Sequence, residues 1–118
     1  TLEDIGIQEQ VEQWEAIQSF HGPKILVDSD EMLVNPAHTF PKICEALGIP
    51  FQPQMLHWPA GPKGNDGPWW PHWYSQVHAS TGFGPASELG LPLEGRYAEV
   101  EVQALPYYEN LYSQRLTF

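Results

Sequence analysis

The sequence contains few cations: five lysines and arginines stand against fifteen aspartates and glutamates, which gives a formal net charge of −10. Five cations spread over 118 residues cannot form the basic stripe that nucleic-acid binding requires, nor a patch that attracts an anionic membrane. This shortage argues against nucleic acid and membranes as partners. An anionic small ligand would have to be held by local groups against an unfavourable overall field.

Cysteine and long apolar runs are also scarce. Cys44 is the only cysteine, so no disulfide can form within the chain, and the cytoplasm is the expected compartment. Its position in the apolar pattern of a predicted helix indicates a small buried side chain rather than a nucleophile. No apolar run reaches the roughly 18 residues of a membrane span, and no signal peptide is recognisable.

The apolar spacing predicts one mainly helical domain over residues 1–118. Local signals mark the helix ends: Thr1 to Asp4 is a capping-box pattern, Asn35-Pro36 a helix start, and Gly48 a left-handed C-cap. Pro106 should kink or split the last helix. Helices are expected over residues 1–20, 36–47, 69–79 and 93–116, with a short helical turn at 53–58 and irregular chain over 81–92.

One strand is expected, at Lys24-Ile25-Leu26-Val27-Asp28. Its almost wholly apolar sequence predicts burial on both faces, as in a parallel sheet. A lone strand has no partner in its own chain, so its N–H and C=O groups would be left unpaired at a cost. We therefore expect the sheet to be completed by sequence outside this chain or by another chain, as a homo-oligomer or with a partner protein.

The densest pattern lies in the loop of residues 58–74, where one lysine stands among three glycines and four prolines. Gly61, Gly64 and Gly67 let the backbone approach another body closely, because no Cβ stands in the way. Lys63 supplies a single ammonium at the centre of this stiff loop. The pattern suits one bound anion, a phosphate in particular. The alternative, a Gly/Pro-rich connector packed on aromatic side chains, stays open.

Two stretches resemble the C-terminal portion of the sulfotransferase family. The first is Ile25-Leu26-Val27-Asp28-Ser29-Asp30-Glu31-Met32-Leu33-Val34-Asn35-Pro36, running on to Ala46-Leu47-Gly48-Ile49-Pro50. The second, Lys63-Gly64-Asn65-Asp66-Gly67-Pro68-Trp69, is similar to the family's Arg-Lys-Gly-x-x-Gly-Asp-Trp-Lys loop. The resemblance covers nearly the whole chain and looks closest to a bacterial sulfotransferase-like branch.

The resemblance implies a P-loop-type α/β fold for the family and 3′-phosphoadenosine 5′-phosphosulfate as the sulfuryl donor. It implies that the loop closes over the 3′-phosphate of that nucleotide, with Lys63, Gly64, Gly67 and Trp69 as the cofactor-binding residues. Backbone N–H groups of the two glycines, beside a helix opening near Trp69, would cradle the phosphate, and Lys63 would add a charge. Trp69 would pack on the nucleotide or on the core.

The chain also departs from the family pattern. Pro62, Pro68 and Trp70 replace an Arg, an Asp and a Lys of the loop, which leaves one cation and predicts weak nucleotide affinity. No Gly-x-x-x-x-Gly-Lys-Ser/Thr motif occurs, so the N-terminal phosphosulfate half of the family domain is missing. Residues 1–118 are therefore expected to form the C-terminal half, without catalytic residues and inactive alone. The alternative is a stand-alone interaction or oligomerisation module.

Two further patterns have simpler interpretations. His57, His72 and His78 match no standard zinc spacing, and we expect surface or cap histidines and no metal site. The tryptophans around Trp70 and Trp73 could form a sugar-stacking platform, but their helical spacing favours the core of the domain.

Overall fold

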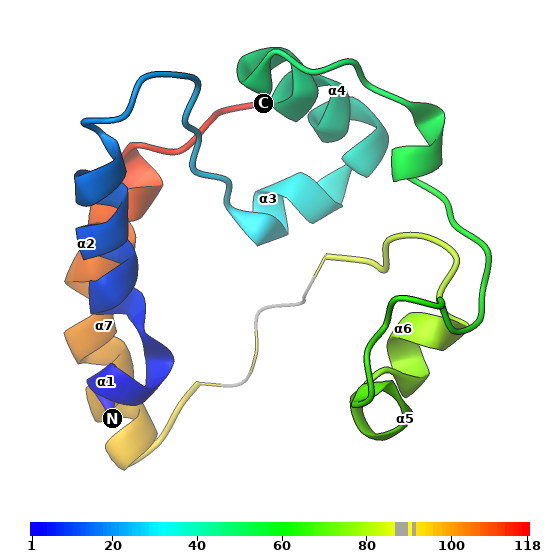
Figure 1. Ribbon diagram of the computed structural model, residues 1–118. Helices are drawn as coiled ribbons and strands as arrows, with labels where there is room; N and C mark the ends of the chain where they lie inside the picture. Colours follow the sequence, from blue (N-terminus) through cyan, green and yellow to red (C-terminus); the bar gives the residue numbers. More distant parts are fainter. Residues whose placement is uncertain (87–89, 91) are drawn as a thin grey trace.

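The computed structural model describes residues 1–86, 90 and 92–118 (Figure 1). Within these residues the chain is helical, and its only β-type pairing is an isolated antiparallel bridge between His57 and Gly82. The predicted irregular stretch 81–92 lies partly outside the described residues. The elements are α1 (Leu2–Ile5), α2 (Ile7–Ile17), α3 (Ser29–Val34), α4 (Pro36–Leu47), the 3₁₀ turn η1 (Pro53–Met55), α5 (Trp70–Trp73), α6 (Ser75–Ala79) and α7 (Arg96–Ser113).

The first and last helices form one layer, in which α1 and α2 pack along α7 (Figure 1). The predicted capping box is confirmed: Thr1 Oγ1 accepts from the Asp4 backbone N–H, and Asp4 caps Thr1 in return. The first helix is not continuous as predicted, because Gly6 adopts a left-handed conformation, with φ 64°, and separates α1 from α2. Val11 and Leu111 are buried in this layer.

Helix α7 runs through Pro106 without a break, so of the two predicted effects of this proline, a kink or a split, the split does not occur. A proline costs a helix the hydrogen bond to the carbonyl four residues earlier, here that of Val102. The Val102 side chain is 70% exposed, so this turn faces solvent and water can satisfy the carbonyl. None of the described helices combines the length and apolarity that a membrane crossing needs.

The predicted buried strand at Lys24–Asp28 is wrong. This segment is half-buried and forms no ladder, and the Leu116 N–H donates to the Leu26 carbonyl at 2.8 Å. The physical reason is the one that makes a lone strand costly: no described segment offers it a parallel or antiparallel partner. The segment instead leads into α3, where Asp28 Oδ1 accepts from the Glu31 N–H at 3.0 Å as the N-cap.

Helix α4 follows its sequence signals closely. Asn35 is its N-cap residue, Pro36 its first residue, and Gly48 ends it in the left-handed conformation, with φ 69°. The Gly48 and Ile49 N–H groups donate back to Glu45 and Cys44 carbonyls, which is the paired arrangement of a Schellman C-cap. The Cys44 side chain is buried, with its sulfur 3.7 Å from that of Met55. The prediction of a small buried side chain is thus confirmed.

The predicted helix over residues 69–79 is two short helices, α5 and α6, interrupted at Tyr74. Its aromatic residues do not form the core, contrary to the prediction. Trp69 is 70% exposed and Trp73 is 76% exposed, and Val77 is exposed as well. Figure 1 shows the reason: α5 and α6 lie across the fold from the layer of α1, α2 and α7, so nothing in that layer covers them.

The chain leaves much of its surface uncovered. Its accessible surface is 9220 Å², against about 6,500 Å² for a folded monomer of this mass. The radius of gyration is 17.1 Å, against about 13–14 Å for a compact domain of this length. The described apolar side chains that are buried are Val11, Cys44 and Leu111.

Candidate functional site

The loop of residues 58–74 is fixed at its base by backbone pairing. The Trp58 N–H donates to the Thr81 carbonyl at 3.0 Å, beside the bridge between His57 and Gly82. Gly82 permits this close approach, because a Cβ there would lie 3.1 Å from the Leu56 carbonyl oxygen. The two ends of the segment that carries the loop and α5–α6 are thereby held together.

Aromatic packing attaches this base to α4. The ring centroids of Phe40 and Phe83 lie 4.9 Å apart, and Trp58 meets Phe83 edge-on at 5.3 Å. The Trp58 indole N–H donates to Ser80 Oγ at 2.9 Å, so its polar atom is also satisfied. The loop therefore projects from a base that is anchored through both its backbone and its rings.

Lys63 and Asp66 close the centre of the loop as a tight turn. The Asp66 N–H donates to the Lys63 carbonyl at 3.1 Å, and the Lys63 N–H donates to Asp66 Oδ2 at 2.5 Å. The Lys63 ammonium turns back onto the Pro59 carbonyl, at 2.7 Å. The backbone N–H and the side-chain ammonium of Lys63 thus both donate to atoms of the loop itself.

Asp66 also contacts α6. Its Oδ2 lies 2.8 Å from Nε2 of His78, and the two side chains are only 17% and 12% exposed. The hydrogen bond from the Lys63 N–H, followed by that of His78, holds the pKa of the Asp66 carboxyl below its ordinary value. An ionised carboxylate only accepts, so Nε2 is the donor of this pair.

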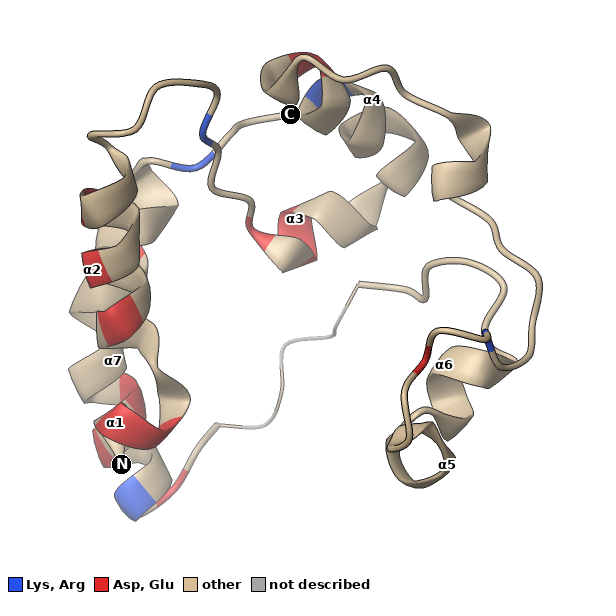
Figure 2. Cartoon of the chain, viewed as in Figure 1, with Lys and Arg blue, Asp and Glu red and all other residues tan. Residues whose placement is uncertain are grey.

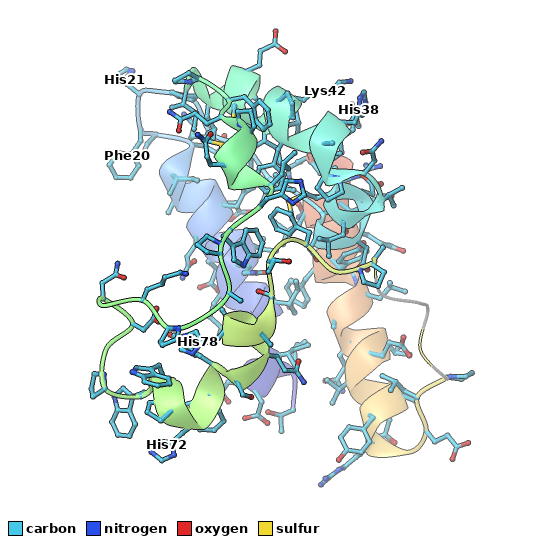
Figure 3. All side chains as sticks on the ribbon, turned by 90° about the vertical axis from the view of Figure 1, so that its right-hand side faces the viewer. Phe20, His21, His38, Lys42, His72 and His78 are labelled. Carbon is cyan, nitrogen blue, oxygen red and sulfur yellow. The ribbon has the colours of Figure 1, made fainter. Side chains whose placement is uncertain are left out.

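The His78 ring contacts two aromatic rings, one on α5 and one at Tyr74 between α5 and α6. The Trp70 ring lies 4.9 Å away and tilted, and the Tyr74 ring meets it edge-on at 5.8 Å. The His78 carbonyl accepts from the Gly61 N–H at 2.7 Å, so its backbone is tied to the loop too. His78 therefore faces the loop, whereas His72 points away from it in Figure 3.

Gly64 lies in this turn and Gly67 directly follows it, and both residues are exposed. A Cβ at either position would meet nothing within 4 Å, and Gly67 has a left-handed φ of 70°. Trp69 follows with its indole exposed rather than packed on the core. The helix that opens after Trp69 has only four residues, so the contribution expected from a helix dipole is not available. Backbone amides and Lys63 remain as the candidate groups for the predicted anion.

Sequence reasoning missed Asp66 and His78 as parts of this site. The sequence pattern includes Asp66 only as one residue of the family-like loop, and it predicts a surface or cap position for His78. No spacing rule links residues twelve apart across a Gly/Pro loop, because their contact depends on how α6 folds back. Among the described residues, no group of three or more His, Cys, Asp and Glu side chains is placed to hold a metal ion.

A second polar cluster joins α3 to the end of α7. The Tyr108 hydroxyl donates to Asp28 Oδ2 at 2.8 Å, and the Arg115 guanidinium binds both carboxylate oxygens of Glu31 at 2.8 Å. Asp28, Tyr108 and Arg115 line one side of an open cavity of about 620 Å³, whose other walls are α2 and the extended segment 25–27. This second cluster fixes the position of α7. Its residues come from other elements than those that carry the loop of residues 58–74.

Many acidic residues lie on α1, α2 and α7, on the opposite side of Figure 2 from α5 and α6, and others lie on α3. The loop is therefore separated from much of the negative charge that the composition suggests would oppose an anion.

A family model described as a sulfotransferase domain matches residues 3–115 of the chain. The chain belongs to the sulfotransferase-domain family. The resemblance drawn from the sequence is thus confirmed for the family. The assignment to a bacterial branch and the identity of the sulfuryl donor stay predictions.

Two curated relatives of this sulfotransferase-domain chain come from Arabidopsis thaliana. Branched-chain-amino-acid aminotransferase-like protein 2 is 33% identical over 111 residues, which cover 94% of this chain and 20% of the relative. Branched-chain-amino-acid aminotransferase-like protein 1 is 34% identical over 110 residues, covering 93% of this chain and 20% of the relative. The chain spans about a fifth of the length of these relatives, and their names describe the whole proteins. No solved structure matches the chain significantly.

Proposed function

We propose that this chain supplies the part of a sulfotransferase domain that binds the 3′-phosphate of 3′-phosphoadenosine 5′-phosphosulfate. Family membership supports the class of activity. The observation that carries the proposal is the turn between Lys63 and Asp66, which gathers the one cation of the loop and its glycines at an open surface.

The loop residues fit a phosphate in charge and in space. Among the described residues, the hydrogen-bond partner of the Lys63 ammonium is the neutral carbonyl of Pro59, which a phosphate oxygen replaces favourably. Open space above Gly64 and Gly67 lets their backbone approach the anion. Trp69, with its exposed indole, is placed to stack on the adenine. With one cation available, the affinity is weak.

Binding alone is the role proposed for these 118 residues. The sulfuryl donor carries the group to be transferred on its 5′-phosphate, and no Gly-x-x-x-x-Gly-Lys-Ser/Thr loop for that end occurs in the sequence. The groups that stabilise the transferring sulfuryl must come from another segment or chain. We assign residues 1–118 to the C-terminal half of the domain and assign no catalytic residue to them.

A second candidate function is favoured by the uncovered surface. The accessible area of 9220 Å² and the exposed side chains of Trp69, Trp73 and Val77 suit an interaction or oligomerisation module without nucleotide binding. Titration calorimetry with adenosine 3′,5′-bisphosphate separates the two candidates. Binding that depends on Lys63 supports the nucleotide role, and its absence at millimolar ligand leaves the interaction module.

A further inference from the structure

We propose that Asp66 is an internal ligand of the loop: without nucleotide, its carboxylate occupies the site where a phosphate oxygen binds. When the nucleotide displaces the carboxylate, that phosphate oxygen accepts hydrogen bonds from the same two donors, the Lys63 N–H and His78 Nε2. This inference rests on the proposed function of the loop. It adds His78 to the binding residues and makes Asp66 a built-in competitor of the ligand.

The first argument is the convergence of two donors on one oxygen. Asp66 Oδ2 accepts from the Lys63 N–H at 2.5 Å and lies 2.8 Å from His78 Nε2. A backbone N–H and an imidazole N–H aimed at the same anionic oxygen form a small anion site. A carboxylate and a phosphate present oxygens of similar size and charge, so the same donors serve both.

The second argument is that His78 is positioned independently of Asp66. Its ring is held between Trp70 and Tyr74, and its carbonyl accepts from the Gly61 N–H at 2.7 Å. The donor Nε2 therefore keeps its direction after the carboxylate leaves. A preorganised donor costs less entropy to engage, which favours its use by an incoming ligand.

The third argument is that glycines lie on both sides of Asp66, whereas the His78 ring is held by its neighbours. Asp66 lies between Gly64 and Gly67, and a Cβ at either glycine would meet nothing within 4 Å. Glycine backbones change φ and ψ at low cost, so the turn can swing its carboxylate outward. The charge of Asp66 would otherwise oppose the phosphate at close range, since like charges in one site repel.

The experiment compares three variants of the intact protein by titration calorimetry with adenosine 3′,5′-bisphosphate. Asp66→Asn removes the competing charge at constant shape and should tighten binding by about fivefold or more. His78→Phe keeps a ring between Trp70 and Tyr74 but has no donor, and should weaken binding by about fivefold or more. Asp30→Asn, which removes one exposed acidic charge outside the loop, is the matched control and should change the dissociation constant less than about twofold.

A second measurement needs no substitution at Asp66. The carboxyl ¹³C resonance of Asp66 in the unsubstituted protein should shift on saturation with the bisphosphate, because the carboxylate exchanges two protein donors for water. An unchanged resonance at saturation overturns the inference.

The outcomes separate this inference from the proposed function. If the unsubstituted protein binds in a Lys63-dependent way and Asp66→Asn binds equally or more weakly, the internal-ligand role is wrong and the loop function stands. If neither the unsubstituted protein nor Asp66→Asn binds at millimolar ligand, both are wrong. Tighter binding by Asp66→Asn together with weaker binding by His78→Phe supports the inference.

Discussion

Glu31 and Arg115 form a two-pronged ion pair across 84 residues of sequence, with both nitrogen–oxygen distances at 2.8 Å. The guanidinium also lies over the Tyr112 ring, 3.5 Å from its centroid, and the Tyr112 hydroxyl donates to Glu31. Paired hydrogen bonds fix the relative orientation of the two groups as well as their distance. The end of α7 is thereby fixed against the start of α3.

This pair predicts an acid-sensitive component of stability. The hydrogen bonds from Arg115 and Tyr112 lower the pKa of the Glu31 carboxyl below its ordinary value of 4.5. Folding therefore favours the ionised form, so the stabilisation is complete above about pH 4.5 and is lost as the pH falls through the lowered pKa. In Glu31→Gln the urea midpoint should be lower at neutral pH and should fall less on acidification. Glu15→Gln, an exposed substitution on α2, should keep the acid dependence of the unsubstituted protein.

An alkaline titration tests the neighbouring contact. The hydrogen bond to Asp28 is the main cause that raises the pKa of Tyr108 from 10.0 to about 12. The protonated phenol is favoured by folding, so its contribution is present below about pH 10 and is lost as the pH rises through about 12. Phenolate absorbance should show a late step, to which Tyr112 also contributes because its hydrogen bond to Glu31 raises its pKa; Tyr108→Phe should lower the amplitude of this step by one phenol, and Asp28→Asn should move that part to lower pH. If Tyr97→Phe lowers the amplitude instead, the assignment is wrong.

The left-handed cap of α4 makes a stability prediction. Gly48 has φ 69° with open space around it, so an added Cβ would clash with no neighbour and would only strain the backbone. Gly48→Ala should lower the free energy of unfolding by about 1–2 kcal/mol. Gly84→Ala, which also adds a Cβ in open space but at an unstrained φ, should change it by less than about 0.5 kcal/mol. Equal effects of the two substitutions would show that φ at Gly48 is not the cause.

Self-association tests the uncovered surface. If the chain folds by itself, the exposed side chains of Trp69 and Trp73 should drive a dimer or larger assembly. Such an assembly should bury well over about 1,000 Å². Sedimentation velocity over a concentration series measures this directly. A single monomeric species at the highest concentration would contradict the prediction.

The helix ends could be predicted from the sequence because they depend on a few adjacent residues. Thr1 with Asp4 and the turn at Gly48 satisfy backbone groups locally, whereas Asn35-Pro36 marks the start of α4 without a side-chain cap hydrogen bond; all three positions agree with the structure. The strand at Lys24–Asp28 failed because an apolar run is only a strand if another strand pairs with it. The exposure of Trp73 could not be predicted either, because helical spacing shows that residues share a face but not what covers it.

Composition identified the loop of residues 58–74, but it did not predict the hydrogen bonds inside the loop. A lysine among glycines marks a place where a backbone and a charge can meet an anion; Lys63 and Gly64 lie in one turn, and Gly67 directly follows it. The hydrogen bond from the Lys63 N–H to Asp66 depends on the conformation of the loop, which the sequence pattern does not show. The contact between Asp66 and His78 depends on how α6 folds back onto the loop, so residue spacing does not predict it.

The measurement that tests the central claim most directly is the calorimetric titration of adenosine 3′,5′-bisphosphate into the intact protein and its Lys63→Ala variant. We predict weak binding that the substitution weakens by about tenfold to a hundredfold, because a charge-assisted contact to the phosphate is lost. Lys42→Ala, which removes a cation of α4 outside the loop, should leave the affinity within about twofold. No heat at millimolar bisphosphate, or equal binding by the Lys63→Ala variant, would contradict the claim that this loop binds the nucleotide.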